Sequence, residues 1–251
     1  MSRGQASMSM PLAIRYALLG MLAFICACVS HEAIGHGGAC LATGGRVVLL
    51  TSVFFHCEPA SAFVDAAGTV LNLAVAGLAW LALARCTLSS TMRLFAIFVF
   101  AFNALWGTGY FIYSAVLDTG DLAFVWRDNP EVPAWLWRAS LGAVGIFLYS
   151  RAMRSMAPRL PPRLPVLIVY VSAGVLAVAS VTLARTDFFA AAREALAESV
   201  LASAGLAYLA LTDGKPRALS TTAVSPIAGW FAMACVPIIA VFLLSLGRGV
   251  T

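Results

Sequence analysis

Residues 12–36 read LAIRYALLGMLAFICACVSHEAIGH, an apolar run that ends in a cluster of ionisable side chains. A helix that spans a bilayer needs about 20 apolar residues, and the run reaches that length before His31. The final hexapeptide holds two of the chain's three histidines, His31 and His36, with Glu32 between them. Ionisable side chains in or near a bilayer are costly and usually functional. We therefore expect a membrane helix with a functional site at one end.

The composition extends this interpretation to the whole chain. Of its 251 residues, 61% are hydrophobic and 11% are charged, whereas soluble domains carry about 25% charged residues. We expect an all-α polytopic membrane protein with six or seven transmembrane helices. The sixth expected span contains Glu198 and could lie in the interface instead. The expected spans are 12–34, 62–84, 94–117, 134–152, 164–184, 195–211 and 224–246.

The polar motifs lie in the front half of the chain. We expect residues 1–133 to form the membrane core that carries the site, and 134–251 to add transmembrane helices whose role has no motif to define it. Between the first two spans, residues 46–55 are rich in β-branched and aromatic side chains and follow two glycines. This pattern predicts a short strand or hairpin that is buried against protein or lies at the interface.

The charge distribution predicts an orientation. With seven spans, most basic residues fall on the side of the N-terminus, which the positive-inside rule makes cytoplasmic. The acidic loop 118–131 and the His31–His36 motif fall on the other side. We expect a multi-pass protein of a membrane such as the bacterial inner membrane, surrounded by lipid. The net charge of +5 includes no long basic tract, so no nucleic-acid partner is expected. The basic residues that cluster on the expected cytoplasmic side are Arg85, Arg93, Arg151, Arg154, Arg159, Arg163, Lys215 and Arg217.

The spacing of the two histidines departs from the zinc-protease pattern His-Glu-x-x-His. In that pattern the rings are four residues apart and share one helix face. Here they are five apart, so on a regular α-helix they would diverge by about 140°. A π-bulge would restore the shared face, or the helix could unwind at Gly35, Gly37 and Gly38. Either way we expect His31 and His36 to bind zinc, with Glu32 activating water.

Zinc in a catalytic site needs a third protein ligand. The third expected span ends on the same side of the membrane as the first, and there it brings Asp118 and Asp121. These carboxylates are three residues apart and would share a helix face, so either could be the ligand. Asn72, near the start of the second span, also lies on that side and is expected to hydrogen-bond a substrate or a water molecule.

Three of these segments together resemble the site-2 protease family of intramembrane zinc metalloproteases. They are His31-Glu32-x-x-x-His36, Ala67-Gly68-Thr69-Val70-Leu71-Asn72, with threonine where the family has proline, and Leu117-Asp118-x-Gly120. The resemblance covers roughly residues 12–125. It implies hydrolysis of a peptide bond in or near a transmembrane segment, with a membrane protein or peptide as substrate. It also implies that Asp118 is the third ligand.

Two other interpretations remain open. His56, Cys57 or Cys40 could complete a closed, structural zinc site. The protein could also be non-catalytic, either a pseudoprotease or a metal-binding transport or assembly factor. The six cysteines are scattered and contain no Cys-x-x-Cys pair, so no disulfide framework is expected.

Overall fold

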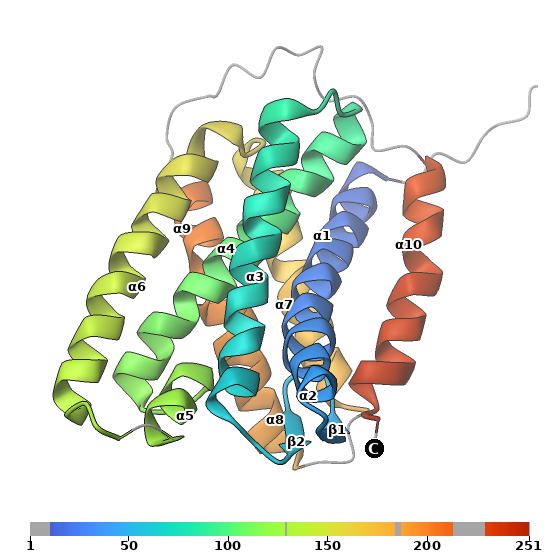
Figure 1. Cartoon of the computed structure of the whole chain (residues 1–251). Helices are drawn as coiled ribbons and strands as arrows, with labels where there is room; N and C mark the ends of the chain where they lie inside the picture. Colours follow the sequence, from blue (N-terminus) through green and yellow to red (C-terminus); the bar gives the residue numbers. More distant parts are fainter. Residues whose placement is uncertain (1–10, 129, 184–186, 213–228, 251) are drawn as a thin grey trace, which may run out of the picture.

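The computed structural model describes residues 11–128, 130–183, 187–212 and 229–250 as a bundle of roughly aligned helices with one small sheet at its end (Figure 1). The first helix is continuous through three segments: α1 (Leu12–Cys28), the π-helical η1 (Val29–Gly37) and α2 (Gly38–Ala42). After the sheet come α3 (Ala62–Arg85), α4 (Ser90–Leu117), α5 (Asp121–Asp128), α6 (Ala134–Met156), η2 (Ala157–Arg159), α7 (Arg163–Val181), α8 (Phe188–Ala195), η3 (Leu196–Leu201), α9 (Ala204–Thr212), α10 (Gly229–Phe242) and η4 (Leu243–Gly247).

Four helical stretches in the described residues are long and apolar enough to cross a membrane, which suggests a membrane protein. They are Leu12–Ala42, Ala62–Arg85, Ser90–Leu117 and Arg163–Val181. The all-α class is confirmed, whereas the expected total of six or seven spans stays a prediction. The seventh expected span lies partly outside the described residues, because these resume only at Gly229.

The outside of the bundle is apolar, as a lipid-facing surface would be. Large hydrophobic side chains on several helices are more than half exposed, among them Leu78, Phe147 and Val171. Such a surface would be an aggregation hazard in water. It is the surface expected for helices that pack in a bilayer.

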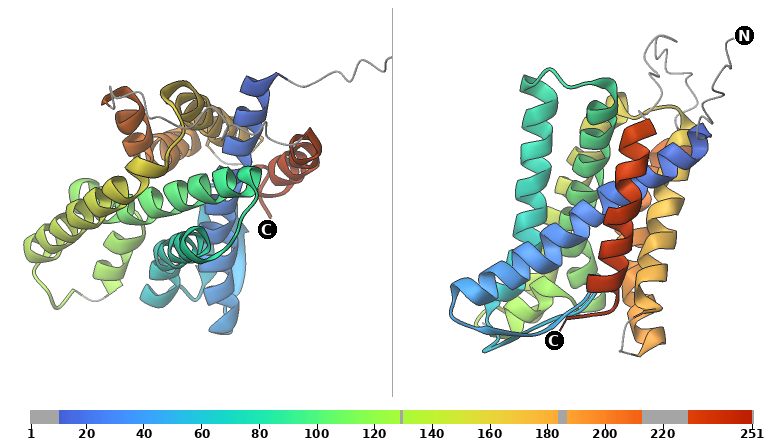
Figure 2. Two further views of the ribbon diagram at one scale, coloured as in Figure 1. Left: turned by 90° about the horizontal axis from the view of Figure 1, so that it is seen from above. Right: turned by 90° about the vertical axis from the view of Figure 1, so that its right-hand side faces the viewer.

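Residues from both halves of the chain form one buried apolar cluster. Phe24 of α1 stacks on Trp106 of α4, with ring centroids 5.6 Å apart, and meets Phe242 of α10 edge to face. Met156 and Leu206 belong to the same cluster. Figure 2 shows that α1 crosses the bundle obliquely, with α10 on one side and α3 and α4 on the other. The packing therefore holds the tilted first helix, and the motif at its end, from several sides.

The segment expected as a strand or hairpin is a hairpin. β1 (Arg46–Leu50) pairs antiparallel with β2 (Phe55–Glu58), and residues 51–54 form the turn. The outer edge of β1 is engaged at one point, where Leu50 and Val250 exchange two backbone hydrogen bonds. The hairpin lies at the end of the bundle (Figure 1), so its edge does not face the apolar surface.

A disulfide between Cys40 and Cys57 joins α2 to β2. The expectation of no disulfide was therefore wrong, because spacing along the chain does not show which cysteines the fold brings together. The same bond removes both thiols as metal ligands. His56 is more than half exposed and lies 3.7 Å from the Glu58 carboxylate. The closed, structural zinc site is thus not formed.

Candidate metal centre

The π-helical segment η1 resolves the unusual spacing of the histidines. The imidazole Nε2 atoms of His31 and His36 lie only 3.2 Å apart, although an α-helix would turn the two rings away from each other. A π-helical turn holds an extra residue, and such turns are frequent at functional sites. Of the two expected ways to restore a shared face, the structure shows the π-helix.

Asp121 is the carboxylate that joins the two histidines. Its closest oxygens lie 3.2 Å from Nε2 of His31 and 3.4 Å from Nε2 of His36. Tetrahedral zinc with ligand bonds of about 2.0–2.1 Å would hold its ligand atoms roughly 3.3 Å apart. His31, His36 and Asp121 therefore form a buried group that could hold a metal ion.

Asp118 does not belong to this group. It adopts a left-handed conformation with φ 54° and ends α4, and the chain turns again at Gly120 before α5 begins. The break separates Asp118 from Asp121, so the two do not share a helix face as expected. The backbone carbonyl of Asp118 accepts a hydrogen bond from Arg127. The carboxylate implied by the family resemblance is thus not the one that meets the histidines.

Neighbouring residues orient two of the three groups, His36 and Asp121, through hydrogen bonds. The Nδ1–H of His36 donates to the Val64 carbonyl at 2.7 Å, which leaves Nε2 free to bind a metal. The Thr69 hydroxyl donates to Oδ2 of Asp121 at 2.9 Å. Burial alone would raise the pKa of Asp121, but the adjacent His36 and His31 imidazoles lower that pKa far below its ordinary value.

Aromatic rings enclose the two imidazoles. His31 stacks against Trp106 and Tyr110, which are one turn apart on α4. His36 stacks on Phe55 of β2, with centroids 5.3 Å apart. The hairpin therefore forms one wall of the site, while α4 forms another.

Two glycines allow α3 to approach the motif closely. A Cβ atom at Gly35 would meet the backbone of Gly68, and a Cβ at Gly68 would overlap Nε2 of both His36 and His31. The space occupied by the metal-binding atoms exists because α3 has no side chain at this point.

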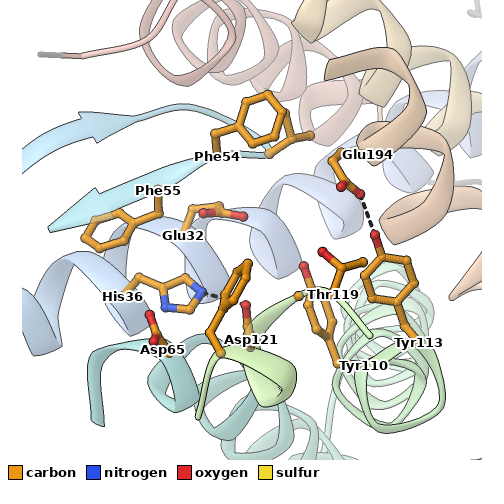
Figure 3. A pocket seen from close by; sticks show the side chains of 13 residues that line it. Glu32, His36, Phe54, Phe55, Asp65, Tyr110, Tyr113, Thr119, Asp121 and Glu194 are labelled. Atoms are coloured by element: carbon orange, nitrogen blue, oxygen red, sulfur yellow. Dashed lines mark hydrogen bonds and ion pairs between the residues drawn. The ribbon is translucent and has the colours of Figure 1, made fainter. Parts of the chain in front are cut away.

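A cavity of about 150 Å³ is lined by two of the three candidate ligands, His36 and Asp121. Glu32 lines it and is only 2% exposed. Figure 3 shows the Glu32 carboxylate among the side chains of the cavity wall, with His36 and Asp121 nearby. Among the described residues, none forms a hydrogen bond or an ion pair with Glu32. An unpaired buried carboxylate beside potential metal ligands is placed to exchange a proton with water in the cavity.

No family model, characterised protein or solved structure matches this chain.

Asn72 is not part of the cavity wall. It is fully buried on α3, where its Cβ faces Gly107 of α4, and no described residue hydrogen-bonds its side chain. The expected contact with substrate is not supported by this position.

Residues that the sequence did not indicate do line or support the site: Thr69, Phe55, Tyr110, Tyr113 and Glu194. Glu194 has no comparable sequence signal, because Asp187, Arg193 and Glu198 surround it in the chain.

Proposed function

We propose that this protein is a membrane-embedded zinc metallopeptidase that hydrolyses a peptide bond in or near a transmembrane segment. The proposal is supported by the Glu32 carboxylate, which has no partner among the described residues and shares a cavity with His36 and Asp121 of the possible metal-binding group. Three protein ligands leave a position open for water or substrate, as in catalytic zinc sites. A purely structural site would need a fourth ligand and no cavity.

Each residue has a defined task in this proposal. His31, His36 and Asp121 hold the metal ion, which when bound supplies a Lewis acid and acidifies water. Glu32 accepts a proton from the attacking water and then donates it to the leaving amine. Thr69 and the Val64 carbonyl keep two of the ligands in orientation.

The hairpin offers a surface on which an extended substrate could bind. Among the described residues β2 pairs only with β1, and Phe55 of β2 lines the cavity. A substrate segment added to the free edge of β2 would be held by backbone hydrogen bonds. Proline substitutions in 47–58 that left cleavage intact would contradict this part of the proposal.

We also propose that the end of the bundle with the site faces away from the cytoplasm. The described arginines at the helix termini of the other end, for example Arg85, Arg93 and Arg163, fit the positive-inside rule. The Cys40–Cys57 disulfide fits an oxidising compartment. A membrane-impermeant maleimide applied to intact cells should label an engineered Glu131→Cys at the end with the site and leave the exposed Cys86 at the other end unlabelled. The reverse pattern would overturn the orientation.

The function is tested by comparing wild type with Glu32→Gln. The variant should keep its zinc, because Glu32 is not a ligand. It should lose proteolysis of a peptide mixture by roughly 10²–10⁴-fold, the usual contribution of a general base. Glu131→Gln, on an exposed turn outside the cavity, serves as a control that should cleave normally. Equal activity of wild type and Glu32→Gln would instead favour a non-catalytic, metal-binding membrane protein.

A further inference from the structure

The cavity beside the metal ligands is strongly acidic. Four of the described residues that line it are carboxylates, namely Glu32, Asp65, Asp121 and Glu194, and none of these described residues is lysine or arginine. They come from separate elements: η1, α3, α5 and α8. The acidity is therefore a property of the folded cavity, and no single segment of sequence shows it.

A bound metal would not balance this charge. A divalent cation offsets one ligand carboxylate, Asp121, and the general base, Glu32. Asp65 and Glu194 then remain, and neither forms an ion pair within the part of the chain that the structure describes. Both side chains are partly buried, and a nearby cation favours the charged form of such a carboxylate. The cavity is thus suited to a ligand that brings a positive charge.

Glu194 is the carboxylate best placed to meet that charge. The Tyr113 hydroxyl donates to its Oε2 at 2.7 Å, which fixes the side chain and leaves Oε1 for a ligand. In Figure 3 Glu194 lies across the cavity from His36, whereas Asp65 lies beside His36. Glu32, which is 2% exposed and has no hydrogen-bonding partner among the described residues, lines the cavity between them. A group that reaches from the metal ligands past Glu32 would meet Glu194.

We propose that Glu194, held by Tyr113, binds a positively charged amine or guanidine group of the substrate and so determines which peptide bond is cleaved. This inference rests on the proposed hydrolytic site and adds a substrate class to it. It also gives α8, in the half of the chain without motifs, a role in specificity. The charged group could be a lysine or arginine side chain or a free amino terminus, and the two sources share the same chemistry.

Peptide hydroxamates provide the test, because the hydroxamate binds the metal and the rest of the probe reports the cavity. Three probes are compared by calorimetry on the zinc-loaded protein: N-acetyl-norleucine hydroxamate, N-acetyl-lysine hydroxamate and norleucine hydroxamate with a free amine. A hydrogen bond to a charged group should make at least one charged probe bind about 10-fold tighter than the neutral one. The lysine and free-amine probes distinguish the two sources.

The variant Glu194→Gln keeps an oxygen for Tyr113 but removes the charge. It should bind the neutral probe as wild type does and lose the preference for the charged probes. Glu131→Gln removes the same charge from an exposed turn outside the cavity and should keep the preference. Equal binding of all probes by wild type, or an unchanged preference in Glu194→Gln, would overturn the inference.

A second measurement separates this inference from the proposed function. Thermal stabilisation by butylammonium, compared with butanol, needs no bound metal. Stabilisation by the ammonium alone, lost in Glu194→Gln, would support the cation site even if no hydroxamate bound and the proposed hydrolysis were wrong. Equal effects of both compounds on wild type would count against the cation site.

Discussion

The two ends of the helical bundle are built from the same helices, but only one of them, among the described residues, buries a cluster of ionisable side chains. At one end His31, His36 and Asp121 are buried and lie against one another. At the other end arginines such as Arg85 and Arg154 are exposed and solvated. Exposed charges at helix ends need no partner, whereas buried ones require compensation. The contrast teaches that burial of ionisable groups, more than their presence, identifies the functional end.

The largest loss of zinc affinity should come from adding a side chain to α3 at Gly68, beside the metal-binding histidines. In Gly68→Ala the new methyl group would overlap both metal-binding imidazoles, and we expect zinc affinity to fall by at least about 100-fold. Competition with a fluorescent zinc chelator measures this. Gly77→Ala on the same helix, where a Cβ meets open space, is the matched control and should bind zinc normally. Wild-type affinity in Gly68→Ala would mean that the histidines do not act together.

A smaller effect is expected from the residue that orients Asp121. Thr69→Val preserves the shape but removes the hydroxyl that donates to Oδ2. Loss of such a supporting hydrogen bond typically costs 10- to 100-fold in metal affinity, and we expect that range in the same competition assay. Thr69→Ser keeps the hydroxyl and should restore most of the affinity. If both variants bound zinc equally weakly, packing of the threonine methyl would be the cause instead.

Removing the π-helix should change zinc binding even less. Deletion of Ala33 gives His-Glu-x-x-His, which places both rings on one face of an ordinary α-helix. Because a π-helical turn accommodates one extra residue, the deletion should remove the π-helix and leave the flanking packing in place. The variant should therefore retain zinc at the wild-type stoichiometry, as measured by elemental analysis. A folded variant without zinc would show that the π-helical geometry itself is required.

The smallest effect, a change in stability with no change in zinc binding, should come from Arg159 at the end of the bundle opposite the metal centre. Arg159 lies over the Trp80 ring, 4.0 Å from its centroid. Arg159→Ala should lower the free energy of unfolding by about 0.5–2 kcal/mol, the usual range for a cation–π contact, and leave zinc content unchanged. Thermal denaturation with Arg154→Ala as the exposed control measures the difference. Loss of zinc in Arg159→Ala would contradict the separation of the two ends.

The sequence could predict the class of fold and the histidine pair because both depend on local patterns. Apolar length predicts membrane helices, and two histidines with a glutamate at a helix end predict a metal site whatever the turn geometry. The choice between Asp118 and Asp121 could not be made in the same way. It depends on the left-handed turn at Asp118, which changes the direction of the chain within two residues.

Contacts between segments that are far apart in the chain could not be predicted from the sequence for a different reason. Thr69 meets Asp121 across 52 positions, and Tyr113 meets Glu194 across 81 positions. The Cys40–Cys57 pair likewise depends on the hairpin that returns the chain to α2. None of these pairs has a spacing pattern, because tertiary packing brings them together. The same holds for Asn72, whose position along the chain suggested the site but whose helix face lies against α4.

We infer that His31, His36 and Asp121 form one metal centre and that Asp118 is not one of its ligands. This inference is tested most directly by zinc stoichiometry of the protein purified under metal-replete conditions, with wild type, His36→Ala, Asp121→Ala and Asp118→Ala compared by elemental analysis. We expect about one zinc per chain in wild type and Asp118→Ala, consistent with a single three-ligand site, and little or none in His36→Ala and Asp121→Ala. No zinc in wild type, or zinc lost in Asp118→Ala and kept in Asp121→Ala, would contradict it.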